Sequence, residues 1–214
     1  MKPTLTIIIT LIMWFSVLSG CNNAVNDMEA ESEGAGPPPE AMEFASLERF
    51  QSAYSGGGLA HFGIDSSAKL YLPAITPDGY ELYTIAVSYG SISLRSLPEE
   101  HTDSQWSILE AQNSNKHFAL WYALPNDEIP NTPANLLEQF GAGDKDLIND
   151  KYIFASPASF FWVEEETMFS VSLPLTMVTP FASALRDENI DGTAIMDYEG
   201  FNEILKFLHV EVLQ

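Results

Sequence analysis

Residues 80–97, YELYTIAVSYGSISLRSL, decide the fold of this chain. Two strand-like runs lie on either side of Gly90: Tyr80–Tyr89, which is rich in β-branched and aromatic residues, and Ser91–Leu97. Such runs favour strands, and a glycine between them supplies the backbone freedom that a tight turn needs. The segment therefore predicts a β-hairpin.

Four segments further along the chain also predict strands, the first of them aromatic but poor in β-branched residues. They are His117–Leu124, Tyr152–Ala155, Ser159–Val163 and Thr167–Leu173. The last two are joined by Glu164-Glu165-Glu166, and consecutive strands separated by tight turns favour antiparallel pairing. With the hairpin they predict a mostly antiparallel sheet of about five to six strands.

The best-marked helix follows the strand predicted at His117–Leu124. Thr132 is suited to cap a helix, Pro133 to occupy its first position, and Gly141 to end it. The apolar face between them consists of Leu136, Leu137 and Phe140. This spacing predicts a short amphipathic helix that packs against the sheet.

Two further helices are predicted near the ends of the globular part. Apolar residues recur at helical spacing in residues 47–54, which three glycines follow, and again in residues 198–208. Helices before, between and after the strands predict an α+β fold. We expect one domain over residues 43–214, with the helices packed against the sheet.

The composition is strongly acidic, with 30 Asp and Glu residues against nine Lys and Arg, a net charge of −21. Hydrophobic residues make up 46% of the chain, which is enough to bury a core. An acidic surface repels nucleic acid and anionic lipid headgroups, so we expect no nucleic-acid partner. Because Cys21 is the single cysteine, an intrachain disulfide and a thiolate metal site are excluded.

The first twenty residues have the layout of a signal peptide. Lys2 provides a positive start, and Leu5–Val17 is apolar apart from Thr and Ser, too short to span a bilayer. The tetrad Leu18-Ser19-Gly20-Cys21 then resembles the lipobox of bacterial lipoprotein precursors. By that resemblance residues 1–20 are removed, and Cys21 receives a thioether-linked diacylglycerol and becomes the mature N-terminus.

This resemblance implies a protein held on the extracytoplasmic face of the cell membrane by a lipid anchor at Cys21. Two or more acyl chains on one residue anchor a protein stably, whereas one chain does not. The alternative is an ordinary secretory signal peptide with a coincidental cysteine. Removal of residues 1–20 leaves eight bases against 30 acids, a net charge of −22.

Residues 21–42 are expected to be a tether between the anchor and the domain. The stretch from Glu29 to Glu40 has no apolar period and no basic residue. Its glycines add freedom, its three prolines stiffen the end, and its like charges extend it. Such a segment would hold the domain away from the membrane surface.

One segment before the hairpin resembles a known sequence pattern. It consists of Tyr71-Leu72-Pro73 followed by Pro77-Asp78-Gly79-Tyr80-Glu81-Leu82. Pro77 sets φ for a turn, Gly79 permits positive φ, and Tyr80 begins the strand. The segment resembles uncharacterised lipoproteins and anti-sigma-factor-like extracytoplasmic proteins of Firmicutes. The resemblance implies an extracytoplasmic location and a sheet-forming scaffold, and it carries no catalytic residue.

The strongest candidate metal site lies ahead of the last predicted helix. Asp187, Asn189 and Asp191 place oxygen ligands at alternate positions before Gly192, as an EF-hand calcium loop begins. The twelfth position of such a loop requires a carboxylate, and here it is Tyr198. The hypothesis is a calcium-stabilised connection, and the alternative is a polar turn.

Other candidate sites are weaker. No two of the four histidines have the spacing of a zinc motif. Paired carboxylates can perform acid–base hydrolysis, and three clusters occur: Glu99/Glu100/Asp103, Asp144/Asp146/Asp150 and Glu164/Glu165/Glu166. Aromatic residues fall on both faces of two predicted strands, at Trp121-Tyr122 and Phe160-Phe161-Trp162. One face of each must be core, and the other would be either an exposed platform for a ligand or a surface covered by helices.

The sequence therefore favours a lipid-anchored extracytoplasmic module that binds or senses a ligand without catalysis. Its ligand would be an envelope protein, a peptide or a glycan, and no cofactor is expected apart from the hypothetical calcium. One alternative is a cell-envelope hydrolase that uses paired carboxylates. Another is a calcium-stabilised interaction module.

Overall fold

The fold is built around a large antiparallel sheet. The computed structural model describes residues 41–102, 110, 116–126, 128–143, 146–155, 158–187 and 199–213. Eight strands form the main sheet in the order β1-β3-β4-β5-β9-β8-β7-β6, with every neighbouring pair antiparallel. Their bounds are β1 (Met42–Phe44), β3 (Tyr80–Ser88), β4 (Ser91–Pro98), β5 (Phe118–Ala123), β6 (Leu147–Ile148), β7 (Tyr152–Ala155), β8 (Ser159–Glu164) and β9 (Thr167–Ser172).

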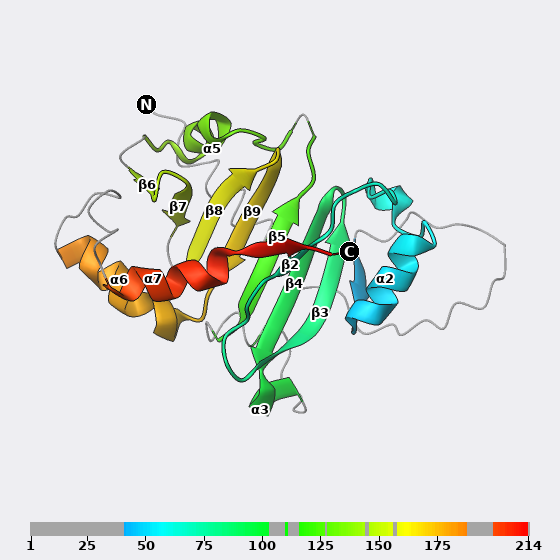
Figure 1. The fold of residues 1–214 in the computed structure, drawn as a ribbon, viewed down its shortest axis with the longest axis horizontal. Helices are drawn as coiled ribbons and strands as arrows, with labels where there is room; N and C mark the ends of the chain where they lie inside the picture. The colour runs from blue at the N-terminus through cyan, green and yellow to red at the C-terminus, as the bar shows by residue number, and fades with distance from the viewer. Residues whose placement is uncertain are drawn as a thin grey trace.

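A two-stranded ribbon and a set of helices complete the described fold. The ribbon pairs β2 (Tyr71–Pro73) with β10 (Val210–Val212), and β10 crosses the front of the sheet in Figure 1. The helices are α2 (Leu47–Ser55), α3 (Glu99–Thr102), α5 (Pro133–Phe140), α6 (Leu175–Asp187) and α7 (Glu199–Leu205), with short 3₁₀ turns at Ala60–Phe62 and Lys206–Leu208. This arrangement confirms the predicted α+β fold.

All six predicted strands are present, and the sheet extends beyond them at both edges. The additional strands β1 and β6 contain only three and two residues, so they carry too little periodicity to be recognised from sequence. The predicted turn before β3 is also confirmed, because Gly79 has a φ of 74° and the Tyr80 amide donates to the Pro77 carbonyl at 3.1 Å.

The local signals for α5 are confirmed in detail. Thr132 is the N-cap, and its hydroxyl accepts a hydrogen bond from the Asn135 amide at 3.2 Å. Pro133 is the first helical residue, and Gly141 ends the helix in the left-handed region at a φ of 62°. Each residue type suits its position because it satisfies or removes a backbone group that the helix end leaves unpaired.

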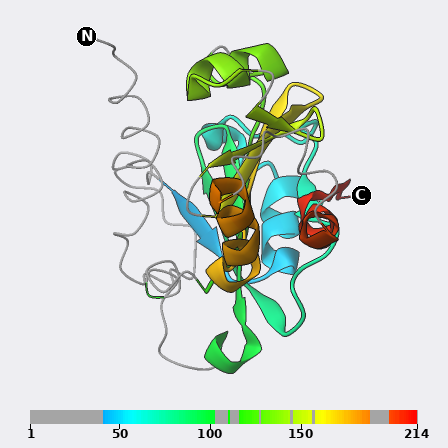
Figure 2. The ribbon, with the colours of Figure 1, turned by 90° about the vertical axis from the view of Figure 1, so that its left-hand side faces the viewer.

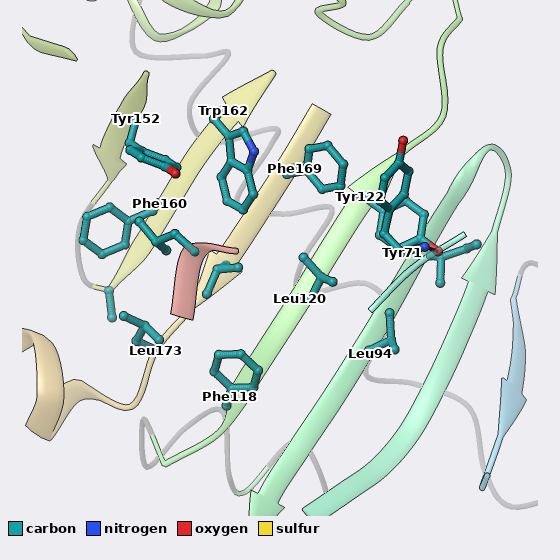
Figure 3. Close-up of a cluster of buried hydrophobic side chains, with 14 of the residues drawn as sticks. Tyr71, Leu94, Phe118, Leu120, Tyr122, Tyr152, Phe160, Trp162, Phe169 and Leu173 are labelled. Atoms are coloured by element: carbon teal, nitrogen blue, oxygen red, sulfur yellow. Dashed lines mark hydrogen bonds between the residues drawn. The ribbon is translucent and has the colours of Figure 1, made fainter. Parts of the chain in front are cut away.

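One face of the sheet carries an aromatic core, shown in Figure 3. Trp162 and Phe169 stack with ring centroids 5.1 Å apart, and Tyr152 meets the Trp162 ring edge-on at 5.4 Å. Helices α2, α6 and α7 contribute Phe50, Phe181 and Phe201 to the same cluster. Figures 1 and 2 show these helices beside the sheet. The helices cover this side because their phenylalanine rings are buried against the aromatic residues of the strands.

The opposite face is divided into two parts. Near β7 and β8, Leu136 of α5 and Phe161 belong to a second apolar cluster. Toward β3 and β4, the outward positions of β4 are Ser91, Ser93 and Arg95, each at most 6% exposed. The Arg95 Nε donates to the Ser93 hydroxyl at 3.3 Å, and burial lowers the pKa of this guanidinium. This part of the sheet therefore carries buried polar side chains, among them a charged one.

Candidate functional site

A pocket lies at the end of the sheet that holds the β3–β4 and β8–β9 turns. Its volume is about 510 Å³, which falls within the range of small-molecule sites. Three chain segments line it: the loop 63–71, the end of β5 at residues 124–125, and the β8–β9 turn at residues 165–167. The charged side chains in the lining are Asp65, Lys69, Glu165 and Glu166.

The loop 63–71 is held in place by hydrogen bonds from side chains to its backbone. The Tyr54 hydroxyl of α2 lies 2.7 Å from the Ser66 carbonyl and 2.8 Å from the Ala68 carbonyl, so it donates between them. Asp65 accepts hydrogen bonds from the Ser67 hydroxyl and from the Ser67 amide, which lower the pKa of its carboxyl group. These bonds fix the rim of the pocket although its residues are exposed.

Tyr71 connects the pocket to the aromatic core. Its backbone amide donates to the buried Tyr122 hydroxyl at 3.0 Å, and its ring meets Phe169 edge-on at 4.9 Å. Figure 3 shows Tyr71 and Tyr122 next to Phe169. Burial raises the pKa of both phenols, so both stay protonated at neutral pH. The pocket is thus continuous with the aromatic core through Tyr71.

An ion pair spans the pocket. The Lys69 ammonium lies 2.5 Å from a Glu165 carboxylate oxygen, and the two side chains are 57% and 60% exposed. Their hydrogen bond, and then their opposite charges, raise the pKa of Lys69 and lower that of Glu165. Because both groups are exposed, water and salt screen the pair and its contribution to stability is small.

Glu165 and Glu166 form a strained two-residue turn between β8 and β9. Glu164 pairs with Thr167, and the two residues between them have φ angles of 49° and 63°. A two-residue turn with positive φ at both positions is normally made by Asn-Gly or Gly-Gly. A residue with a Cβ atom costs roughly 1–2 kcal/mol in this region, so the turn holds two glutamates at the pocket against a local preference.

An exposed aromatic side chain lies near the pocket. Tyr89, at the β3–β4 turn, is 59% exposed, and its ring is 6.0 Å from Phe62. The next residue, Gly90, donates to the Phe62 carbonyl and accepts from the Leu124 amide, both at 2.7 Å. These backbone bonds place Tyr89 beside the segment that carries the pocket residue Leu124.

The exposed aromatic platform that the sequence left open is not formed at Phe160-Phe161-Trp162. The three side chains are 0%, 5% and 0% exposed. Phe161 points away from the main core, but α5 covers it, and the Phe140 and Phe161 rings are 4.8 Å apart. Trp121 is half-buried against the same cluster. The alternative in which helices cover both faces is therefore correct for this segment.

Among the described residues, only the Glu164/Glu165/Glu166 cluster contributes to the lining of the pocket. Glu165 and Glu166 line it, whereas Glu164 pairs with Lys151 at 2.7 Å. Glu99 and Glu100 begin α3, and Asp146 accepts from the Gly143 amide at 2.8 Å. Asp103 and Asp144 lie outside the described residues.

Several predicted site residues are not placed by the structure. Cys21 precedes the described part of the chain, and Asn189 and Asp191 also lie outside it. Asp187 is the last residue of α6, and α7 begins at Glu199, so the calcium hypothesis stays a prediction. Within the described residues, no three His, Cys, Asp or Glu side chains are grouped to hold a metal ion, and no helix could span a membrane.

Sequence reasoning missed the pocket itself. It named Glu165 and Glu166 in a charged connection and in one of three carboxylate clusters, and Tyr71 only in a strand-like segment. It did not select Asp65 or Lys69. One signal was present: Glu-Glu in a two-residue loop between strong strands contradicts the residue preference of such a turn. The pairing of Lys69 with Glu165 depends on the tertiary fold, because 96 residues separate them.

Comparisons with protein-family models, with curated proteins and with solved structures found no match to this chain. The fold and the geometry of the pocket are therefore the observations on which a functional proposal depends.

Proposed function

We propose that the chain is a lipid-anchored extracytoplasmic binding module without catalytic activity, and that its ligand occupies the pocket between loop 63–71 and the β8–β9 turn. The observation that carries this proposal is the pocket of about 510 Å³, where charged and hydroxyl groups converge from two separate segments and apolar residues come from a third. Concave sites of this size with a few fixed polar groups are where proteins usually bind small ligands or peptide side chains.

The charge state of the pocket supports binding rather than hydrolysis. A carboxyl group that acts as a general acid at neutral pH needs a raised pKa. Two carboxyl groups of the pocket, Asp65 and Glu165, have shifted pKa values, and hydrogen bonds move both downward. Both groups therefore stay ionised and serve better as fixed acceptors than as proton donors.

The anchor is the second part of the proposal. The lipobox-like tetrad ending at Cys21 and the acidic tether of residues 21–42 support it. Metabolic labelling with a palmitate analogue in a bacterial host should label the wild-type chain and leave Cys21→Ala unlabelled. Continued labelling of Cys21→Ala would refute lipidation at this residue.

The pocket is tested by filling it. Full-length protein in lipid nanodiscs is titrated with short peptides of basic, acidic and neutral composition and with N-acetylglucosamine oligomers. We expect at least one class to shift the amide resonances of residues 63–71 and 165–167. The variant Ser67→Trp, which fills the pocket, should abolish these shifts.

The matched control is Ser66→Trp, because Ser66 is an exposed serine of the same loop that does not line the pocket. It should leave the titration unchanged. If none of the probes shifts the pocket resonances, or if both variants behave alike, the proposed function is wrong.

A further inference from the structure

We infer that the ligand group recognised by this pocket is a primary amine or guanidinium on a peptide side chain, and that Lys69 occupies the place of this group in the free protein. The inference rests on the proposed function and names its ligand class. Four observations carry it: the charges of the lining, the position of Lys69, the fixed turn and the apolar wall.

The lining is acidic. Its described residues include three acids, Asp65, Glu165 and Glu166, and one base, Lys69. The lining therefore has a net charge of −2. The whole chain carries a net charge of −21, which raises the local concentration of cations. An anionic ligand would instead have to replace Glu165 on Lys69 while lying between two further carboxylates, so a cation is favoured.

Lys69 already makes the contact that such a ligand would make. Its ammonium hydrogen-bonds the Glu165 carboxylate, and both side chains are more than half exposed. An exposed pair of this kind is weak and is held by a flexible four-carbon stem, so an incoming cation can replace it. Glu165 also stays ionised, because its pKa is lowered by the same contact.

The backbone that carries the acceptor carboxylates of the pocket is fixed. Glu165 and Glu166 are confined to a two-residue turn whose flanking residues, Glu164 and Thr167, are paired in the sheet. Thr167 is 3% exposed, so the turn is attached to buried structure. A preorganised acceptor loses little entropy on binding, which favours recognition by a small charged group.

Leu124 and Pro125 give the pocket an apolar wall. Lysine and arginine side chains bury their aliphatic stems against apolar surface while the charged group reaches polar partners. A free inorganic cation would not use this wall. The combination of carboxylates and apolar wall therefore fits a basic side chain better than an ion.

A second ion pair beside the same turn provides a matched control. On the other side of the turn Lys151 pairs with Glu164 at 2.7 Å, with side chains 36% and 50% exposed. Neither residue lines the pocket. Removing Lys151 takes away the same charge as removing Lys69, so it separates a general change in charge from the loss of a competing ammonium.

The test uses full-length protein in nanodiscs and two pentapeptides, Gly-Gly-Lys-Gly-Gly and its neutral isostere with norleucine in place of lysine. Dissociation constants are measured from chemical-shift titrations. We expect the lysine peptide to bind at least about tenfold more tightly than the norleucine peptide, as expected for one charge-assisted contact. A tenfold rise in salt should weaken the lysine peptide and leave the isostere unchanged.

The variants then locate the effect. Lys69→Met should tighten binding of the lysine peptide about threefold to fivefold, the upper end of what one exposed ion pair contributes. Glu165→Gln should weaken it about tenfold. Lys151→Met and Glu164→Gln should change it less than about twofold. All four side chains are exposed, so circular dichroism should show folded protein in each case.

The outcomes separate this inference from the proposed function. If the norleucine peptide binds as tightly as the lysine peptide, or if Lys69→Met changes affinity no more than Lys151→Met, the inference is wrong. In either case loss of binding in Ser67→Trp would still support the pocket as the site. If Ser67→Trp has no effect on any peptide, the proposed function fails as well.

Discussion

On the aromatic face of the sheet, Trp162 stacks on Phe169 and is fully buried. At the pocket, Glu165 and Glu166 are exposed and adopt positive φ angles that glutamate disfavours. The first region has the close ring packing of a stable core, whereas the second, a few residues away along β8 and β9, holds its residues at disfavoured backbone angles. The difference indicates that the sheet provides stability and that its turn end is shaped by another requirement, which we take to be binding.

The largest expected effect lies on the aromatic face. Trp162→Ala should lower the free energy of unfolding by about 3–5 kcal/mol, because it leaves a cavity between Tyr152 and Phe169. Chemical denaturation of full-length protein measures the change. A loss below about 1 kcal/mol would mean that this face is not the main source of stability, and the comparison would break.

The second effect concerns the bond between the two regions. In Tyr122→Phe the Tyr71 amide loses the hydroxyl to which it donates at 3.0 Å. A buried amide without a partner costs about 1–3 kcal/mol, and the pocket floor should loosen as well. Hydrogen exchange of the Tyr71 amide should therefore become faster in Tyr122→Phe, by a larger factor than exchange of the strand amides of β4. Unchanged exchange at Tyr71 would show that another group satisfies this amide.

The aromatic sheet was predictable, because its signals are local. The strands around Gly90 and the caps at Thr132 and Gly141 each depend on residues adjacent in the chain. Helix α6 was missed, because Pro180 lies inside it and proline usually ends a helix. Tertiary packing overrides that signal: Val178 and Phe181 are 0% and 2% exposed in the core.

The pocket was less predictable than the sheet, because its parts are distant in the chain. Lys69 and Glu165 meet only after the β2–β10 ribbon is placed on the sheet and β8 pairs with β9. Nothing in the sequence around Lys69 marks it as a site residue. Only the Glu-Glu turn carried a local signal, in the form of a mismatch between residue type and backbone conformation.

The third prediction uses that mismatch. Replacing the turn by Glu165→Asn with Glu166→Gly should raise the free energy of unfolding by about 1–2 kcal/mol, because these residues accept positive φ. The same double variant should lose binding to the lysine peptide. Denaturation and titration measure the two effects on one sample. A more stable protein with unchanged binding would show that the two glutamates have no role in recognition.

The smallest effect is the pH dependence of the ion pair, and its sign follows from the two pKa shifts. The pKa of Glu165 lies below its ordinary value of 4.5, so its contribution is present above that pH and disappears as pH falls through the lowered pKa. The pKa of Lys69 lies above its ordinary value of 10.5, so its contribution is present below that pH and disappears as pH rises through the raised pKa.

The melting temperature of wild type should therefore exceed that of Lys69→Met by a degree or less at neutral pH, and the two should converge in acid as Glu165 is protonated. Binding of the lysine peptide should disappear over the same acid range, since the ligand and Lys69 use the same carboxylate. If peptide binding instead persists after the two melting temperatures have converged, Glu165 is not the acceptor. The disfavoured backbone angles of the Glu165-Glu166 turn would then need an explanation other than binding of a basic side chain.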